Sequence, residues 1–448
     1  MLSPDAALDR LDAALAAARA AGADAADAVY VGDAAAHVSV RLGKLEDTGR
    51  AEGEEVGLRV FVGQRSASVS SSDLTPAALA EAASRAVAMA RLAPEDPYAG
   101  LAPEDRLAKG ELPDPDIDDP TEVGAAQLKE RALACEDAAR AVAGITNSEG
   151  ASASAGAVVM ALATSTGFRG ARRSTSHGLS ASVVAGSGGD MQRDYAWHSA
   201  RYLADVEAAD TIGTRAGRRA VARLNPVKLA SAQLPVLFDP RVSASLLGHL
   251  VGAITGSAIA RGTSFLKDRL GQRILPVGLH VIDDPLRHRG LRSRAFDGEG
   301  LATARTALVE DGILTTWLLD VASARQLGLT PSGHASRGTS GPPGAGTSNL
   351  HLEGGTVPRA DLIAGIKRGV LVTELIGMGV NGLTGDYSRG ASGFLIADGE
   401  IAGPVAEITI AGNLTDMFAR LVAADDLAFR HASNAPTLLI DGMTVAGS

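Results

Sequence analysis

The segment that decides the fold class reads Glu55-Val56-Gly57-Leu58-Arg59-Val60-Phe61-Val62-Gly63-Gln64-Arg65-Ser66-Ala67-Ser68-Val69. Apolar side chains recur at every second position on both sides of Gly63-Gln64, which is typical of two half-buried strands joined by a tight turn. The same alternation at Val38, Val40 and Leu42 predicts a further strand upstream. The N-terminal region is therefore expected to contain a sheet with one buried face.

Helices are expected before and after these strands in the sequence. Ser3-Pro4-Asp5 begins a run of helical spacing that stops at Gly22, and Thr75-Pro76 is an N-cap with proline that begins a second helix to about residue 92. A third helix is predicted at about 121–143, with Cys135 on its apolar face as a small buried side chain. Helices and strands that follow one another in runs indicate an α+β fold.

Two domains are predicted, with the boundary at Asn225-Pro226 after a helix near 206–224. Residues 1–225 are an N-terminal α+β domain, and residues 226–448 are a β-rich C-terminal domain with few helices. In the first domain, short strands are expected at 157–162 and 179–184. The elements expected in the second domain are strands at 234–238, 370–376, 393–396, 407–410 and 437–440 and helices near 241–258 and 413–424.

Composition excludes several classes of protein. The 448 residues carry 42 Lys+Arg against 52 Asp+Glu, a net charge of −10, so a direct nucleic-acid partner is not expected. A single cysteine excludes a disulfide framework within the chain and a cysteine-based zinc cluster. No run of 18 apolar residues and no basic, apolar leader is present, which predicts a cytoplasmic protein without a membrane partner.

A glycine pattern, G-x-G-x-x-G, occurs at residues 377–382 after an expected strand. Dinucleotide binding needs a helix to begin at such a loop, because the pyrophosphate is held by helix N–H groups. The residues that follow have turn chemistry and no helical period. The glycines are therefore interpreted as a tight loop that another backbone approaches closely.

Histidine and aspartate offer one metal candidate, formed by His280, Asp283 and His288. A strand that runs into an Asp-Pro turn explains the same spacing, and arginines on both sides of His288 disfavour a nearby dication. His249 stands alone in its helix, and no nucleophile elbow or phosphate-binding loop is present. The residues alone define no self-contained catalytic site.

Longer strings resemble the PmbA (TldE) branch of the TldD/PmbA family over essentially the whole chain. The most specific are Thr373-Glu374-Leu375-Ile376-Gly377 and Val380-Asn381-Gly382-Leu383-Thr384-Gly385-Asp386-Tyr387-Ser388-Arg389-Gly390. Further matching strings lie at 238–250, 260–266, 282–286, 333–338, 407–414 and 441–447. The resemblance implies membership of a two-subunit cytoplasmic metalloprotease that cleaves unfolded or short peptides and processes peptide precursors.

The resemblance also implies which subunit this chain is. In the family, the TldD-like subunit carries an H-E-x-x-x-H helix that binds zinc together with a cysteine near the C-terminus. Aligned on Arg261-Gly262-Thr263-Ser264, the corresponding positions are Leu247, Gly248 and Gly252, and residues 426–433 contain no cysteine. Leucine and glycine supply neither a ligand nor a general base. No catalytic residue, metal or cofactor is therefore expected in this chain, and zinc is expected in the TldD-like partner.

The expected partners are a TldD-like subunit and a linear peptide, with a homodimer of the isolated chain left open. The residues favoured for the peptide cleft or the subunit contact are Arg261, Thr263, Ser264, Asn381, Asp386, Tyr387, Ser388 and Arg389. A structural loop with an Asp386–Arg389 ion pair explains the second group equally well. The family's link to DNA gyrase is not expected to involve DNA contact, because the chain is acidic.

Two other functions stay open. One is a stand-alone metallopeptidase with a divergent site such as His280, Asp283 and His288. The other is a peptide-binding module that acts without a partner, because glycine-rich segments with free backbone groups suit the addition of a peptide as a strand.

Overall fold

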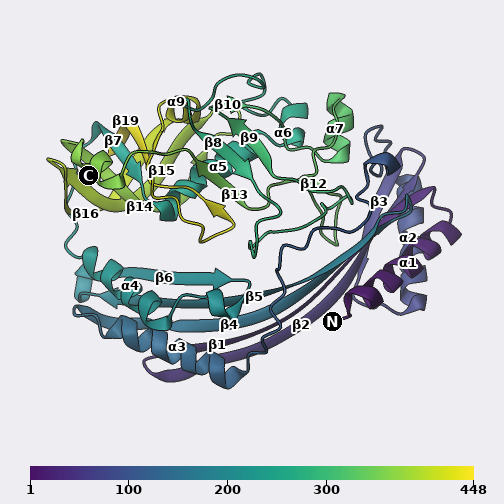
Figure 1. The fold of residues 1–448 in the computed structure, drawn as a ribbon, viewed down its shortest axis with the longest axis horizontal. Helices are drawn as coiled ribbons and strands as arrows, with labels where there is room; N and C mark the ends of the chain where they lie inside the picture. Colours follow the sequence, from purple (N-terminus) through teal and green to yellow (C-terminus); the bar gives the residue numbers. More distant parts are fainter. Residues whose placement is uncertain (448) are drawn as a thin grey trace.

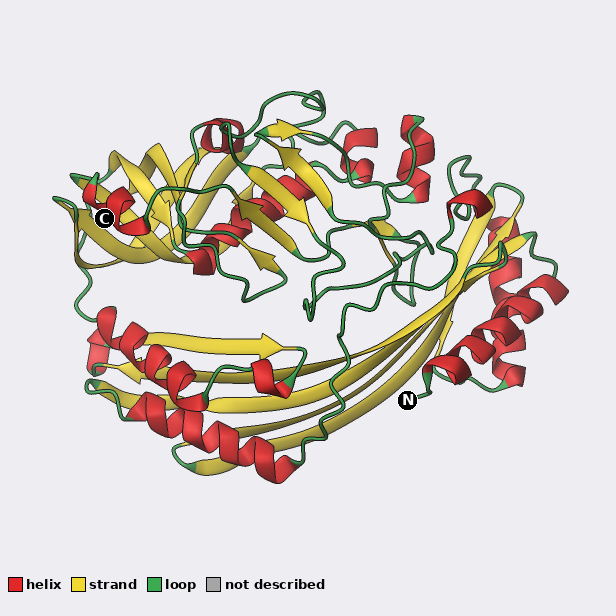
Figure 2. Cartoon of the chain, viewed as in Figure 1, coloured by secondary structure: helices red, strands yellow, loops and turns green. Residues whose placement is uncertain are grey.

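The computed structural model describes residues 1–447 and has two layers (Figure 1). One layer is a long, curved N-terminal sheet, and the other is the C-terminal half of the chain, which lies across the concave side of that sheet. Figure 2 shows the four long N-terminal helices on the outer side of the sheet. The architecture confirms the predicted α+β class with a β-rich C-terminal part.

The N-terminal sheet has six antiparallel strands in the order β3-β2-β1-β4-β5-β6. Its strands are β1 (Ala25–Arg41), β2 (Lys44–Val62), β3 (Arg65–Ser71), β4 (Ile145–Thr164), β5 (Arg169–Ala185) and β6 (Gln192–Ala200). Its helices are α1 (Pro4–Ala20), α2 (Pro76–Leu92), α3 (Ala125–Arg140) and α4 (Ala209–Ala222). Short 3₁₀ turns lie at Glu104–Arg106, Gly188–Asp190 and Leu203–Asp205. Helix, three strands and helix thus occur twice, and β1 and β4 pair at the centre.

Helix starts follow the sequence signals. The Ser3 hydroxyl accepts the Ala6 N–H at 3.3 Å at the start of α1, and the Thr75 hydroxyl accepts the Ala78 N–H at 3.4 Å at the start of α2. Cys135 is fully buried in α3, and burial raises the pKa of its thiol to about 12, which confirms the structural interpretation.

The strands are longer than predicted. The short strands expected at 157–162 and 179–184 are parts of β4, with 20 residues, and β5, with 17. The first half of β4 pairs with β5 through small residues: Ser152 lies opposite Ser180, and Ser154 lies opposite Gly178. Backbone pairing continues through these small polar residues, and an apolar alternation cannot reveal it.

The C-terminal half contains a sheet that closes on itself. Its order is β16-β15-β14-β7-β19-β17, and β16 also pairs with β19. These strands are β7 (Ala232–Phe238), β14 (Arg368–Val380), β15 (Asp386–Ala397), β16 (Glu400–Asn413), β17 (Val422–Ala423) and β19 (Leu438–Ala446). Asn225-Pro226 lies between α4 and β7, so no strand of this sheet comes from the region before that point.

A second sheet and short helices complete this half. The second sheet is β10 (Ile313–Leu314), β9 (Thr306–Glu310), β8 (His280–Asp283), β13 (Leu350–Glu353) and β18 (Ser433–Asn434), and β11 (Ala335–Ser336) pairs with β12 (Gly344–Ala345). The helices are α5 (Pro240–Ala253), α6 (Gly256–Ala260), α7 (Val321–Leu327), α8 (Arg359–Ala364) and α9 (Leu414–Ala419). No helix among the described residues is long and apolar enough to cross a membrane.

Two predicted helices differ from the structure. The helix expected at 241–258 is divided into α5 and α6, because Leu318 pairs with the chain at the break: its N–H donates to Ile254 O and its carbonyl accepts the Gly256 N–H. The helix expected at 413–424 is the six-residue α9, since the chain continues into β17. Both differences depend on pairing between segments that are distant in sequence.

The two layers are joined by an apolar cluster. Val29 and Leu162 of the long sheet pack with Phe296, Leu301 and Val321 of the C-terminal half. The neighbours of Val29 in β1, Ala28 and Tyr30, point the other way into the cluster beneath α1 and α2. Both faces of the central strands are therefore buried, one by helices and one by the C-terminal half.

Candidate functional site

The structure brings the two groups of predicted contact residues together. The Phe265 N–H donates to Gly382 O at 3.0 Å, so the segment after α6 lies against the turn between β14 and β15. Arg261 and Thr263 are exposed on this segment. Ser264 is buried, and its hydroxyl donates to Ala253 O at 2.6 Å and accepts the Leu266 N–H. The Ser264 hydroxyl therefore stabilises the end of α5 and is not accessible to a ligand.

The segment with Asp386, Tyr387, Ser388 and Arg389 is a strand, β15, and not the predicted loop. The alternative with an Asp386–Arg389 ion pair is also wrong. Asp386 accepts the Thr384 hydroxyl at 2.6 Å and the Asn413 amide at 3.3 Å, whereas Arg389 Nε donates to Ile376 O at 3.3 Å. Residues three apart on a strand point to opposite faces, which keeps these two side chains apart.

The turn itself is formed by Asn381. Its side-chain oxygen accepts the Leu383 N–H at 3.0 Å, and its carbonyl accepts the Gly385 N–H at 2.8 Å. At Gly379, a Cβ atom would lie 2.1 Å from Ser388 O. The glycine pattern therefore permits close approach of the neighbouring strand, as predicted, and no helix begins there.

Beneath the strand, Tyr387 packs against His249 of α5. The ring centroids are 5.9 Å apart in an edge-to-face arrangement, and Tyr387 is 1% exposed. Burial lowers the pKa of His249, with a further contribution from Arg389, and burial raises the pKa of the Tyr387 hydroxyl. Both groups are therefore neutral at pH 7.

The α5 positions aligned with the family's zinc helix do not fit a metal. Leu247 is 3% exposed in the main core. Gly248 and Gly252 are exposed, and a Cβ atom at either glycine would meet nothing within 4 Å. The open face of α5 thus has space for side chains, but the two glycines themselves carry no donor atom. No step through zinc can be assigned to these residues.

The alternative metal residues are not brought together. His280 Nδ1 accepts the Asp311 N–H, Asp283 accepts both the N–H and the hydroxyl of Ser348, and His288 is exposed near Asp116. Across residues 1–447, no three His, Cys, Asp or Glu side chains converge on a point that could hold a metal ion.

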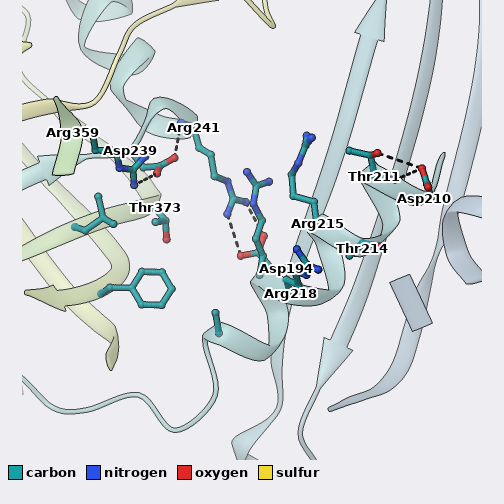
Figure 3. Close-up of a pocket in the computed structure, with 14 residues that line it drawn as sticks. Asp194, Asp210, Thr211, Thr214, Arg215, Arg218, Asp239, Arg241, Arg359 and Thr373 are labelled. Atoms are coloured by element: carbon teal, nitrogen blue, oxygen red, sulfur yellow. Dashed lines mark hydrogen bonds and ion pairs between the residues drawn. The ribbon is translucent and has the colours of Figure 1, made fainter. Parts of the chain in front are cut away.

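A cavity of about 630 Å³ lies between the two layers, where α4 and β6 face α5, α8 and β14 (Figure 3). Arginines and carboxylates line it, and we call it the Asp194 cavity. Its charged lining residues are Asp194, Asp210, Arg215, Arg218, Arg219, Asp239, Arg241 and Arg359. Sequence reasoning did not single out any of these residues as a site.

Carboxylates pair with most of these arginines. Figure 3 shows Arg241 reaching from α5 to Asp194 of β6, with N–O distances of 2.8 and 3.1 Å. Burial of Asp194 raises its pKa, but the bonds from Arg241 outweigh burial and hold the pKa below its usual value. Arg223 lies 3.5 Å from the same carboxylate and 2.5 Å from Glu374 of β14.

Two further carboxylates complete the pattern. Glu207 accepts both Arg215 and Arg430 at 2.8 Å, and the Arg215 bonds lower its pKa to about 2. Asp239 accepts the Arg241 N–H at 3.1 Å as N-cap of α5 and the Arg359 guanidinium at 2.9 Å. Asp194–Arg241 and Glu207–Arg430 join the N-terminal and C-terminal layers, whereas Asp239–Arg359 lies within the C-terminal half, so the lining is mainly structural.

Models of known families match three parts of the chain. Residues 26–90 match domain 1 of the PmbA/TldA metallopeptidases, residues 118–224 match their central domain, and residues 231–447 match their C-terminal domain. The metalloprotease PmbA of Escherichia coli O157:H7 is 40% identical over 92% of this chain and 89% of its own length. A PmbA homologue of Haemophilus influenzae is 35% identical over 92% and 90%.

Solved structures are similar over nearly the whole chain. A protein from Bacteroides thetaiotaomicron described as a modulator of DNA gyrase superposes with a TM-score of 0.90 at 28% identity and covers 98% of both chains. TldE from Thermococcus kodakarensis superposes with a TM-score of 0.87 at 22% identity, covering 98% of this chain and all of the other, and shows the same fold.

Proposed function

Because this chain belongs to the PmbA/TldD metallopeptidase family, we propose that it is the non-catalytic subunit of a cytoplasmic zinc peptidase whose catalytic subunit is TldD-like. The complex would cleave unfolded or short linear peptides and process peptide precursors. In this proposal the chain shapes and closes the peptide chamber, and the partner supplies zinc and the general base.

The observation that carries the proposal is the open face of α5. Gly248 and Gly252 leave space where a zinc ligand and a general base would stand in a catalytic relative, and Leu247 is committed to the core. A zinc hydrolase needs three protein ligands, an open coordination position and a group that moves protons. At the positions aligned with the family's zinc helix, α5 lacks these groups.

A surface for the partner is suggested by the β14–β15 hairpin. Ile376, Met378 and Leu383 are 59%, 85% and 56% exposed at this end of β14 and its turn. Exposed aliphatic side chains beside the polar residues Asp386 and Arg389 have the composition of a protein interface with an apolar centre and a polar rim.

The test compares this chain alone, a TldD-like subunit from the same genome alone, and their equimolar mixture. Zinc content and cleavage of an unstructured peptide are measured for each. We expect no stoichiometric zinc and no cleavage for this chain, and cleavage that rises in the mixture. Stoichiometric zinc with chelator-sensitive cleavage by the pure chain would falsify the proposal and favour the stand-alone peptidase.

A matched pair of variants tests the hairpin surface. Met378→Glu should weaken association with the TldD-like subunit at least tenfold, because it buries a charge in the interface. Leu92→Glu is the control, since Leu92 is 89% exposed at the end of α2 in the other layer. Equal weakening by both variants, or by neither, would remove the hairpin from the interface.

A further inference from the structure

A second cavity of about 600 Å³ lies between the same two layers, with a different charge pattern. It is bounded by β4 and β5 on one side and by α5, residues 291–294 and residues 345–347 on the other. Four arginines line it: Arg172, Arg201, Arg292 and Arg294. No carboxylate is among its lining residues, and we call it the Arg172 cavity.

These four guanidinium groups have no carboxylate within 4 Å in the described part of the chain. Arg201 is occupied by backbone oxygens, donating to Thr175 O at 2.9 Å and to Gly290 O at 3.3 Å. In the part of the chain that the structure describes, Arg294 has one long hydrogen bond, to Gly346 O at 3.4 Å, and its buried Nε has no partner. Within residues 1–447, Arg172 makes no side-chain hydrogen bond, and its guanidinium carbon lies 5.5 Å from the Phe296 ring centre.

The nearest acidic groups are already engaged elsewhere. Asp297 is 1% exposed and accepts the N–H groups of Glu299, Leu301 and Ala335 at 2.9 to 3.0 Å. Asp283 is bound to Ser348 and lies 3.4 Å from His334. They act on Arg294 through space without pairing with it.

A buried guanidinium without a counter-charge cannot become neutral by losing its proton at pH 7, because its pKa is too high. A buried carboxylate can become neutral by gaining a proton: burial and Asp297 raise the pKa of Glu299 to about 8, so Glu299 is neutral at pH 7. Burial, Arg294 and Arg201 lower the pKa of Arg172 only to about 10, so it stays charged. Among the described residues, the cluster therefore lacks a carboxylate that pairs with it directly.

The rest of the lining indicates what kind of anion fits. Ser174, Ser336 and Thr347 also line the cavity and can supply hydroxyl groups as further donors. Aliphatic side chains of Val158, Met160 and Val251 line the same cavity, and Val251 places it against α5. Donors together with apolar surface suit a carboxylate attached to an organic chain better than a bare inorganic ion.

The geometry points to the Arg172 cavity as a binding site for a carboxylate group of a linear peptide, held by Arg172 and Arg294. That the carboxylate belongs to a peptide rests on the proposed function, whereas the anion site rests on the charges alone. The carboxylate can be the C-terminus or an acidic side chain. Both present the two oxygens that guanidinium groups bind.

The test is isothermal titration calorimetry of the full chain, without a TldD-like subunit, against four forms of one acetylated peptide. The forms combine a free or amidated C-terminus with a Glu or a Gln side chain. We expect a charged form to bind at least tenfold more tightly than the doubly neutral form. Loss on amidation assigns the C-terminus, and loss on Glu→Gln assigns the side chain.

Variants locate the site. Arg172→Gln should abolish the tenfold preference, and Arg292→Gln, at an exposed residue of the same cavity, should reduce it. Arg173→Gln is the matched control, because Arg173 is next on β5 and pairs with Asp118 instead. Equal affinity for charged and neutral peptides, no binding of either, or binding of inorganic phosphate alone would overturn the proposal.

The result is independent of the complex. Carboxylate-dependent binding by the isolated chain stands even when no mixture with a TldD-like subunit cleaves peptide, which would reject only the proposed function. A mixture that cleaves peptide while this chain shows no carboxylate preference would reject only the anion site.

Discussion

The Asp194 cavity and the Arg172 cavity lie between the same two layers and are both rich in arginine, but they differ in pairing: among the described residues, carboxylates pair with three of the five arginines that line the Asp194 cavity and with none of the four that line the Arg172 cavity. In the Asp194 cavity, Arg241 and Arg359 each face a carboxylate from another element. In the Arg172 cavity, Arg172 and Arg294 face none in the described chain. Paired arginines fasten the layers, and unpaired ones are available to a ligand.

The largest effect is expected from removing an ion pair of the Asp194 cavity. Asp194→Asn should destabilise the fold by about 3 kcal/mol, because it leaves Arg241 without its buried counter-charge, whereas Arg223 keeps Glu374. Urea unfolding followed by tryptophan fluorescence, to which Trp197 on the same strand contributes, measures the change.

Asp210→Asn is the control for that variant. Asp210 lines the same cavity but is bound only to its neighbour Thr211, so its substitution should change stability by less than about 0.5 kcal/mol. Similar losses for both variants would show that the Asp194 pairs do not fasten the layers.

Glu299 tests the statement that a buried carboxylate that forms no ion pair becomes neutral, since Arg59 acts on Glu299 only through space. Its folded-state pKa of about 8 lies above the ordinary 4.5, so the folded state holds the extra proton between these values. Its contribution to stability is present below about pH 4.5 and is lost as pH rises through 8.

Glu299→Gln should remove this loss and stabilise the protein by about 2 kcal/mol at pH 8.5, with little change at pH 5. Thermal unfolding of both proteins from pH 5 to 8.5 measures the difference. Parallel curves over this range would show that Glu299 does not hold the proton.

Substitution of an unpaired arginine of the Arg172 cavity should change the free energy of unfolding in the opposite direction. Arg172→Met should leave stability unchanged or raise it by about 1 kcal/mol, because it removes a buried charge that no carboxylate compensates. Arg223→Met, at a paired arginine, should lower stability. If urea unfolding shows that both substitutions destabilise the protein, the arginines of the two cavities do not differ in their contribution to stability.

The smallest effect is expected at the exposed hairpin. Arg389→Ala should change the free energy of unfolding by less than about 0.5 kcal/mol, since Arg389 makes one long bond to a backbone oxygen. Under the proposed function it should still weaken assembly with a TldD-like subunit, which analytical ultracentrifugation of the mixture measures. A large loss of stability would make Arg389 structural.

Much of the local structure could be predicted because it depends on neighbouring residues. Caps at Ser3 and Thr75, the alternation around Gly63 and the buried face with Cys135 all appear as expected. The duplication of helix, three strands and helix was not visible, because its strands pair through small residues such as Ser152 and Gly178 that carry no apolar signal.

The site was less predictable, although its signal was partly present. Asp239 and Arg241 lie within a string that resembles the family, but their roles depend on Arg359 and Asp194, which come from other elements. Ser264 was predicted to be a contact residue, but it is buried and has a structural role, since its hydroxyl donates to the carbonyl of Ala253 at the end of α5.

The sequence by itself determined the family, the α+β class and the absence of ligand atoms at Leu247, Gly248 and Gly252, because those features are written in residue identities and short spacings. Only the tertiary structure decided which arginines are compensated. Asp194 meets Arg241 across 47 positions because the start of β6 lies beside the start of α5, whereas Arg172 and Arg294 line one cavity and neither pairs with a carboxylate among the described residues. Electrostatic pairing depends on distance in space, and spacing along the chain does not fix that distance.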